Sequence, residues 1–198
     1  VKHLVVANRT LAEMIATSTT GLYFKAGVFK FEDAILLSTH DASWANDEKY
    51  VDLKVFPRRS QFGRILVLGD PCLWDGTRGY VHYIGWKSCL IKRTCRSTFR
   101  AETHALIYGS EAADHIRAVI ASSRGIELDK DWYTKSAAQT RCVWFTDCQS
   151  LHDYLTNPAG AGCEDKRLEI DIEGSWEDLW EHPNGDLKDA ITENQLTK

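Results

Sequence analysis

At residues 34–41 the chain reads Ala34-Ile35-Leu36-Leu37-Ser38-Thr39-His40-Asp41. The unbroken apolar run predicts a buried strand, and the run ends at an acidic residue. The same pattern recurs at Cys142-Val143-Trp144-Phe145-Thr146, which Asp147 follows. Ligand sites in open α/β sheets gather at the carboxyl ends of strands. We therefore expect Asp41 and Asp147 to lie at one functional edge of a sheet.

The elements around these two strands indicate a mixed α/β fold. The order predicted from residue 34 onward is strand, strand, strand, helix, strand, helix, helix, without internal repeats. Residues 46–60 are predicted to be loop, and a polar connection leads to the strand at 142–146. The other predicted elements are a short amphipathic helix around Leu4–Ile15, strands at Gly21–Phe24, Gly63–Leu68 and Tyr80–Trp86, and helices at Ser97–Ser123, Ser150–Leu155 and Lys166–Trp180.

Glu102 stands out within the long helix predicted at 97–123. On a helix it shares a face with Ala105, Leu106 and Gly109, the stripe that should pack on the sheet. A carboxylate directed there costs several kcal/mol unless its charge is compensated. Two aspartates at the same place would add to this cost. A divalent cation such as Mg²⁺, which prefers hard oxygen ligands, would compensate all three charges.

Each carboxylate also has a simpler interpretation. An Asp after a strand is often a turn former, and Asp147 could cap the helix that follows it. Glu102 could lie at the edge of the apolar stripe and reach solvent. The metal interpretation rests on the three together, distributed over a strand, a helix and a strand.

Composition narrows the class of protein. The chain has 198 residues, 43% of them hydrophobic, which is enough for a packed core. Its formal net charge is −4, so any contact with nucleic acid must use a local basic patch. The six cysteines form no CxxC pair, which disfavours a zinc site and favours reduced thiols in an intracellular protein. No apolar run is long enough to span a membrane, so we expect no membrane partner.

Five sequence blocks occur in a characteristic order between residues 33 and 182. They are Ser38-Thr39-His40-Asp41-Ala42-Ser43-Trp44-Ala45-Asn46, Arg59-Ser60-Gln61-Phe62-Gly63, Trp86-Lys87-Ser88, Arg96-Ser97-Thr98-Phe99-Arg100-Ala101-Glu102 and Thr146-Asp147-Cys148-Gln149-Ser150-Leu151. In these blocks the chain resembles the ribonuclease H region of copia-type LTR-retrotransposon polyproteins. Each block alone is weak evidence, whereas five in order are strong.

The resemblance implies a ribonuclease H-like fold, a mixed central sheet flanked by helices, over residues 26–198. Residues 1–25 resemble the connection to the preceding polymerase region of such polyproteins, which would be a partner of this domain. The implied activity is hydrolysis of the RNA strand of RNA–DNA hybrids with two Mg²⁺ ions, for which Mn²⁺ can substitute. The implied location is cytoplasmic, within retrotransposon particles.

The resemblance also assigns the site. It implies that Asp41, Glu102 and Asp147 are metal ligands and catalytic residues, with Asp41 bridging both ions. Retroviral integrases and many transposases share the fold, but their third carboxylate is a Glu on a late helix. The order Asp, then Glu on the first long helix, then Asp is that of ribonucleases H.

The fourth carboxylate of the family pattern is not recognised in this sequence. Copia-type relatives carry a fourth carboxylate on a last helix, after a fifth strand. We find no convincing fifth strand after Trp180, and Gln195 precedes Leu196-Thr197-Lys198 where an Asp is expected. We therefore expect a domain truncated at its C-terminus, with the fourth ligand beyond Lys198. Asp171 is a weaker candidate, because acidic residues surround it.

A basic stripe precedes Glu102. Lys87, Lys92, Arg93, Arg96 and Arg100 fall within a segment that contains no acid. We expect Lys87 and Arg96 to contact phosphates, and Ser97 and Thr98 to donate hydrogen bonds to the hybrid backbone. Trp44 could pack beneath the site.

Two other functions remain open at this point. One is a non-catalytic ribonuclease H-like module that binds hybrid. The other is a transposase- or integrase-like DNA nuclease.

Overall fold

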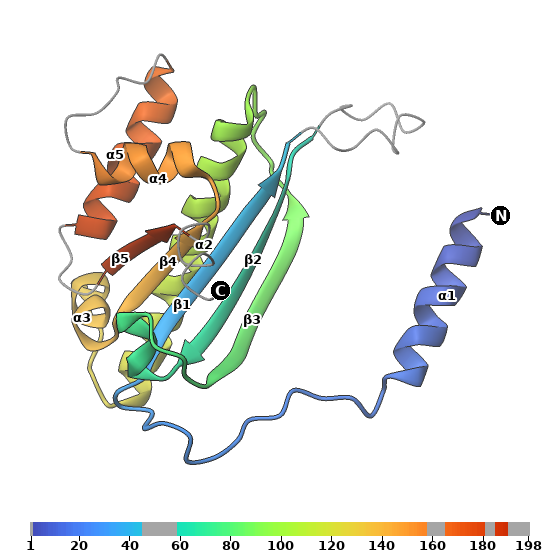
Figure 1. Ribbon diagram of the computed structural model, residues 1–198, viewed down its shortest axis with the longest axis horizontal. Coiled ribbons are helices and arrows are strands. Elements are labelled where there is room, and N and C mark those ends of the chain that lie inside the picture. Colours follow the sequence, from blue (N-terminus) through green and yellow to red (C-terminus); the bar gives the residue numbers. More distant parts are fainter. Residues whose placement is uncertain (1, 45–58, 158–164, 181–184, 190–198) are drawn as a thin grey trace.

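The computed structural model describes residues 2–44, 59–157, 165–180 and 185–189. Its centre is a five-stranded mixed sheet of order β3-β2-β1-β4-β5 (Figure 1). The strands are β1 (Ile35–Ser43), β2 (Gln61–Gly69), β3 (Val81–Leu90), β4 (Cys142–Thr146) and β5 (Gly185–Asp189). The pairs β1–β2 and β2–β3 are antiparallel, and β1–β4 and β4–β5 are parallel. This arrangement confirms the expected mixed sheet.

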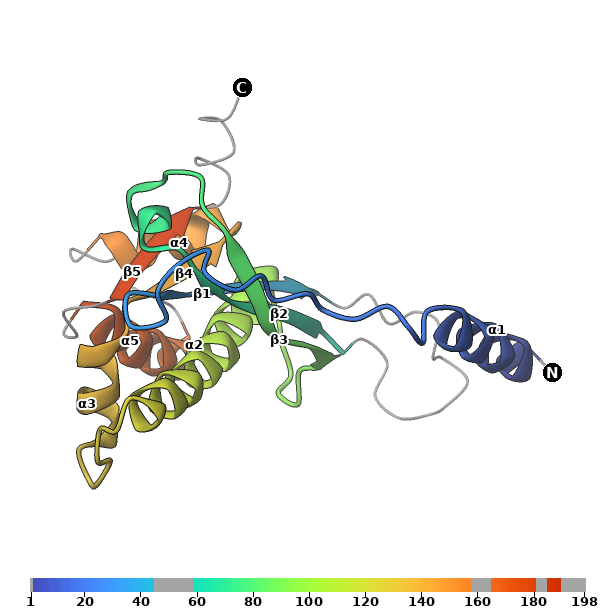
Figure 2. The ribbon, with the colours of Figure 1, turned by 90° about the horizontal axis from the view of Figure 1, so that it is seen from below.

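Helices other than α1 flank the sheet. The helices are α1 (Lys2–Ala16), α2 (Thr98–Ser123), α3 (Trp132–Gln139), α4 (Gln149–Thr156) and α5 (Lys166–Trp180), with a short 3-10 helix η2 (Pro71–Asp75). Figure 2 shows α2, α3 and α5 on one side of the sheet and η2 on the other. No helix in the described part of the chain is both long and apolar enough to cross a membrane.

The alternation of β1 divides the core between the two faces of the sheet. Leu36 belongs to the cluster beneath α2, which includes Leu106 and Trp144. Ile35 and Leu37 form a second cluster on the opposite face, against η2. Past Leu37 this opposite face opens to solvent, because Thr39 and Asp41 are exposed whereas Ser38 and His40 are buried. The end of β1 therefore carries an accessible face.

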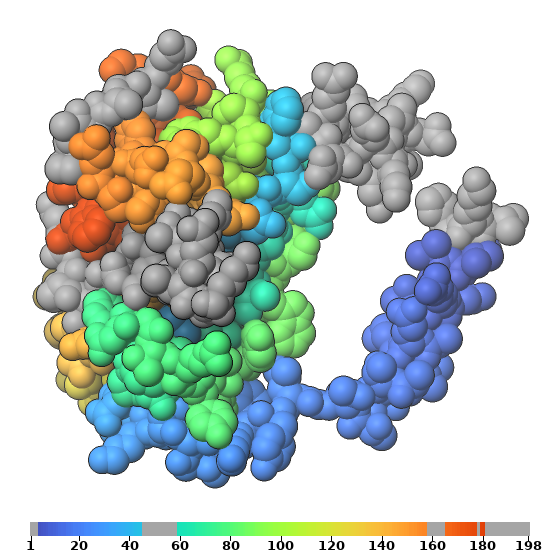
Figure 3. All heavy atoms as spheres, in the orientation of Figure 1, coloured from blue at the N-terminus to red at the C-terminus, as the bar shows by residue number. Residues whose placement is uncertain are grey.

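The N-terminal segment contacts the domain far from that end. Figure 3 shows α1 apart from the sheet and the other helices, and its apolar side chains from Leu4 to Ile15 are exposed. Phe24 and Phe29 contact the ring of His82 near the start of β3, with centroids 5.3 and 5.1 Å away. The division at residue 25 remains a prediction.

The structure differs from the sequence interpretation at three elements. Gly21–Phe24 forms no strand, since it is exposed and has no strand beside it. The connection before β4, for which only polarity was predicted, contains the helix α3. A fifth strand, β5, is present within the chain and pairs with β4, so the expectation that it lies beyond Lys198 is corrected. The predicted loop at 46–60 and the ending at 195–198 lie almost entirely outside the described residues.

Candidate metal centre

Asp41 and Asp147 each lie two residues past the last paired residue of the parallel strands β1 and β4. The pairing of β1 with β4 ends at Thr39 and Phe145, two residues before each aspartate. Both aspartates are exposed. Asp147 follows β4 directly, as predicted, whereas β1 continues to Ser43, so that Asp41 lies inside its strand rather than after it. The pairing register of the sheet thus brings together two carboxylates that are far apart in sequence.

Glu102 comes from the second turn of α2. Ser97 caps this helix, because its Oγ accepts a hydrogen bond from the Arg100 amide at 3.2 Å. Ala101 and Ala105, on either side of Glu102, are fully buried. Gly109 lets the helix approach β1 closely, since a Cβ there would lie 3.3 Å from Ser38 Oγ and 3.4 Å from His40 Nδ1. The close packing of α2 on β1 therefore determines where Glu102 lies.

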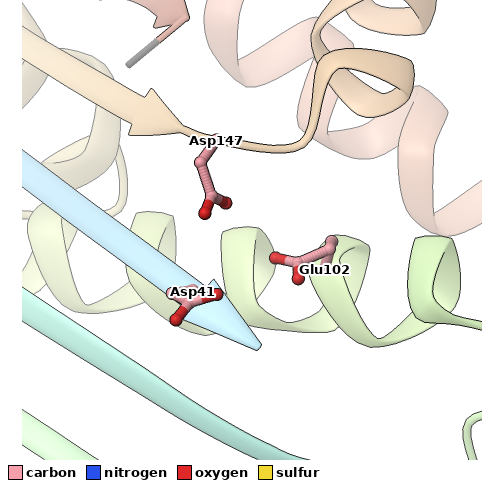
Figure 4. A group of neighbouring side chains, drawn as sticks. All are labelled: Asp41, Glu102 and Asp147. Carbon is pink, nitrogen blue, oxygen red and sulfur yellow. The ribbon is translucent and has the colours of Figure 1, made fainter. Parts of the chain in front are cut away.

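The three carboxylates form one cluster. One oxygen of each lies within 4.8 Å of the others, and Figure 4 shows Glu102 on α2 turned toward the two aspartates. The Glu102 side chain is buried, with 5% of the residue exposed, and its Oε2 has no hydrogen-bond partner. The structure therefore brings together the three carboxylates predicted from the sequence.

Burial and repulsion oppose the charge of Glu102. Burial first, and then the charges of Asp41 and Asp147, raise its pKa to about 7, against a smaller opposing effect of a hydrogen bond from the Ala42 amide. Neighbouring His40 supplies no compensating charge at neutral pH, because complete burial lowers its pKa to about 4. Among the described residues, none of the three carboxylates forms an ion pair. An uncompensated acidic cluster with an unpartnered buried oxygen fits a divalent cation.

The residues expected to contact substrate lie in two places. Lys87 is exposed on β3 and lines a groove of about 420 Å³ together with Asp41. Arg96 lines a larger pocket between the start of α2 and α5. Ser97 and Thr98 are exposed at the start of α2, where the capping bond of Ser97 leaves its hydroxyl hydrogen free to donate. The sequence stripe is thus split between two surfaces.

Trp44 does not pack beneath the site as expected. It is 43% exposed, and its Nε1 donates a hydrogen bond to the Cys95 carbonyl at 3.2 Å. The side chain thereby ties the end of β1 to the loop before α2. Trp44 therefore stabilises the end of β1 and does not pack beneath the carboxylate cluster.

The groove beside Asp41 contains two apolar residues that the site prediction missed. Trp86 is 71% exposed and Ile65 is 43% exposed, and the register pairs these two residues. Both line the groove with Asp41 and Lys87. Strand alternation in the sequence places Trp86 and Ser88 on the same face of the predicted strand. The sequence alone did not show that this face is exposed.

Asp171 is not part of the cluster. Within the described part of the chain the only group of three or more potential metal ligands is the Asp41, Glu102 and Asp147 cluster. The Asp171 carboxylate instead accepts a hydrogen bond from Arg93 Nη1 at 2.8 Å. Asp171 is therefore more than one acid on an acidic helix face, since this ion pair gives its carboxylate a definite partner.

Comparison with known proteins finds matches among solved structures. No protein-family model and no curated protein matches the sequence. Among solved structures, ribonuclease H1 of the archaeon Halobacterium salinarum matches with a TM-score of 0.46 and 17% identity, over 80% of this chain and 89% of that one. The ribonuclease H domain of prototype foamy virus matches with a TM-score of 0.44 and 11% identity, over 79% of this chain and 78% of that one.

A third match is the foamy viral protease–reverse transcriptase in complex with RNA/DNA hybrid, with a TM-score of 0.44 and 10% identity. It covers 90% of this chain and 21% of that much longer one. The chain itself has a five-stranded mixed sheet of order β3-β2-β1-β4-β5 flanked by helices. Within this fold it carries a candidate acidic metal site formed by Asp41, Glu102 and Asp147.

Proposed function

We propose that the chain is a metal-dependent endonuclease that hydrolyses the RNA strand of RNA–DNA hybrids during retrotransposon reverse transcription. The observation that carries the proposal is the meeting of three carboxylates from β1, α2 and β4 within 4.8 Å. If the three carboxylates had only a structural role, basic side chains would be expected beside them. Instead, the buried Oε2 of Glu102 has no hydrogen-bond partner. The resemblance to copia-type polyproteins supports the substrate and the setting.

The three side chains would hold divalent cations, with Mg²⁺ the expected ion and Mn²⁺ a substitute. When bound, such ions lower the pKa of an attacking water and stabilise the leaving oxygen of a phosphodiester. Asp41 and Asp147 face solvent, so a phosphate can reach them from outside. Glu102 holds its carboxylate at the inner side of the cluster, where burial limits access of water. Selectivity for RNA would rest on contacts to 2′-hydroxyl groups, which DNA lacks.

The proposed domain comprises residues 26–198, preceded by a connection to a polymerase region. The fourth carboxylate ligand that the family resemblance implies is not found near the other three among the described side chains. The three described carboxylates are the proposed metal ligands.

The test is cleavage of a hybrid labelled on the RNA strand, with Mg²⁺ or Mn²⁺. DNA duplex, RNA duplex and single-stranded RNA of the same sequence serve as parallel substrates. We expect cleavage of the hybrid only, giving products with a 5′-phosphate and a 3′-hydroxyl. Cleavage of DNA duplex would favour a transposase-like nuclease. Tight hybrid binding without cleavage in either ion would favour a non-catalytic binding module.

A further inference from the structure

An apolar strip runs along the outer strands of the sheet, on the face that α2 does not cover. Strand alternation and register place its five residues on the same side of β2 and β3: Ile65, Val81, Tyr83, Trp86 and Leu90. Each of the five is at least 41% exposed. Within the strip, Ile65 and Trp86 line the groove that also contains Asp41. Contiguous apolar patches on a protein surface mark interaction sites, so the strip needs an occupant.

The helix α1 carries a second uncovered apolar surface. Helical periodicity places Leu4, Leu11 and Ile15 on one side of α1, and all three are more than half exposed. The opposite side carries an exposed ion pair between Arg9 and Glu13. A helix of 15 residues is only marginally stable in water by itself. Its apolar side therefore needs a surface to pack against.

The segment after α1 already connects this helix to the strand that carries most of the strip. Phe24 contacts the ring of His82 at a centroid distance of 5.3 Å, and Lys25 lies over the ring of Tyr80 at 5.3 Å. Both contacts lie at the start of β3, next to Val81. Figures 1 and 2 show α1 beyond the β3 edge of the sheet and apart from it. An anchor for α1 beside the strip is therefore in place.

The chain between α1 and this anchor is long enough to let α1 turn onto the strip. Residues 20–23 are exposed and have no regular structure, and they span up to roughly 14 Å. A helix is roughly 10 Å across, so the axis of α1 can come within packing distance of β3. A Cβ at Gly21 would meet nothing within 4 Å, so this part of the backbone is not packed against its neighbours.

The lengths of α1 and of the strip match. The 15 residues of α1 extend over roughly 22 Å, and the path along β3 from Val81 to Ser88 is roughly 24 Å. With its carboxyl end near the start of β3, α1 would have its amino end beside Ser88. The register pairs Ser88 with Gly63, and Gly63 with Asp41. The positive end of the helix dipole would then lie near the Asp41 carboxylate, which favours this direction.

We propose that α1 folds back onto the strip of its own chain and covers the groove beside Asp41. The apolar side of α1 packs on Tyr83 and Trp86, and the side with the ion pair faces solvent. A second copy of the chain offers the same strip, but the short tether gives α1 a far higher effective concentration at its own. The docked helix would keep nucleic acid out of this groove, a regulatory role that rests on the proposed function.

The test compares two substitutions on opposite sides of α1. Leu11→Gln removes a large side chain from the apolar side. Val6→Gln is the matched control, because Val6 is exposed as well but lies on the opposite side. Glutamine forms helices about as readily as leucine, so neither change disfavours α1 itself. Amide hydrogen exchange of residues 2–16 measures protection of α1, and hydroxyl-radical footprinting of Trp86 measures how far this side chain is covered.

We expect Leu11→Gln to speed amide exchange of α1 roughly tenfold or more, the factor that corresponds to burial of one large apolar side chain. Oxidation of Trp86 should rise as well, whereas Val6→Gln should match the wild type in both measurements. Trp86→Gln, a change outside α1, should likewise speed exchange of α1.

Three results would overturn the proposal. The first is equal exchange of α1 in Leu11→Gln and Val6→Gln. The second is exchange of α1 in the wild type at the rate of an unstructured chain. The third is protection of α1 that grows with protein concentration, because the occupant of the strip would then be a second copy.

Cleavage of hybrid separates this proposal from the proposed function. If α1 restricts the site, Leu11→Gln should cut hybrid several-fold faster than Val6→Gln. If neither protein cuts hybrid while protection of α1 depends on Leu11, the nuclease fails and the docked helix stands. If both cut hybrid at equal rates although protection depends on Leu11, the nuclease stands and the regulatory role of α1 is overturned.

Discussion

Arg93 and Asp171 join the loop after β3 to α5 through a hydrogen bond of 2.8 Å between Nη1 and a carboxylate oxygen. This pair gives Asp171 a structural role on the rim of the pocket between the start of α2 and α5, and separates it from the metal centre. It also removes the only described candidate for a fourth ligand.

Asp171→Asn should therefore leave the metal response intact. The rise in melting temperature on adding Mg²⁺, and the rate of hybrid cleavage, should match the wild type. The stability loss should be at most about 1 kcal/mol, because Arg93 is largely exposed and exposed pairs contribute little. A folded Asp171→Asn protein that no longer cuts hybrid would restore this residue as a metal ligand.

Asp41→Asn should abolish hybrid cleavage while the fold is retained. The neutral amide removes an anionic ligand from a cluster in which the three carboxylates lie within 4.8 Å. Cleavage assays with circular dichroism as the folding check measure both properties. Asp131→Asn is the matched control, since Asp131 is exposed and its side chain makes no capping bond to α3. Wild-type turnover by folded Asp41→Asn protein would contradict the assignment.

Glu102→Gln should change the dependence of stability on pH in the metal-free protein. The ordinary pKa of Glu, near 4.5, is raised in the fold to about 7. Between these values the folded state binds more protons than the unfolded state, so stability falls as pH rises through this window. The variant lacks this loss and should become more stable than wild type as pH approaches 7.

Addition of Mg²⁺ should reverse that ranking. The ion binds the native cluster and should raise the melting temperature of the wild type. The increase should be smaller for Glu102→Gln. Melting curves in EDTA and in Mg²⁺, at pH 5 and pH 7.5, separate the two effects. A metal response that is identical in both proteins would place Glu102 outside the site.

Gly109→Ala should weaken the metal response from a distance. The added Cβ would meet Ser38 Oγ and His40 Nδ1 at 3.3 and 3.4 Å, so these buried side chains or α2 itself must shift by a few tenths of an ångström. We expect part of this shift to be taken up by α2, which carries Glu102. We expect a loss of stability of about 1–3 kcal/mol, as for other overpacked sites. Thermal melts with and without Mg²⁺ measure the two effects.

Gly174→Ala on α5 is the matched control for this change. A Cβ at Gly174 would meet nothing within 4 Å, and alanine favours a helix. This variant should be as stable as the wild type or more so. Equal behaviour of the two alanine variants would mean that the contact of α2 with β1 does not position Glu102.

Several elements were predictable because their own residues specify them. The apolar run of β1, the strand Cys142–Thr146 and the helix Lys166–Trp180 have patterns long or strong enough to be recognised without their neighbours. The N-cap at Ser97 likewise depends on local hydrogen bonding.

Other elements depend on their neighbours. The strand β5 contains one large apolar residue, Leu187, and it forms by pairing with β4. The short helix α3 depends on α2, where Arg117 donates hydrogen bonds to the carbonyls of Ala137 and Thr140 at 3.0 Å. Gly21–Phe24 has a strand-like composition but lacks a partner strand. Main-chain hydrogen bonds between strands cannot be inferred from one strand alone.

The identities of Asp41, Glu102 and Asp147 as one candidate site were available from the residues, because each follows an apolar run or lies on an apolar helix stripe where a charge needs compensation. The meeting of their oxygens within 4.8 Å required the parallel register of β1 with β4 and the close approach of α2 at Gly109. The charged pocket between the start of α2 and α5 required the fold altogether, since Arg96 and Arg167 are distant in sequence. Periodicity reports which face of an element is apolar, whereas the contact between two elements depends on the packing of both.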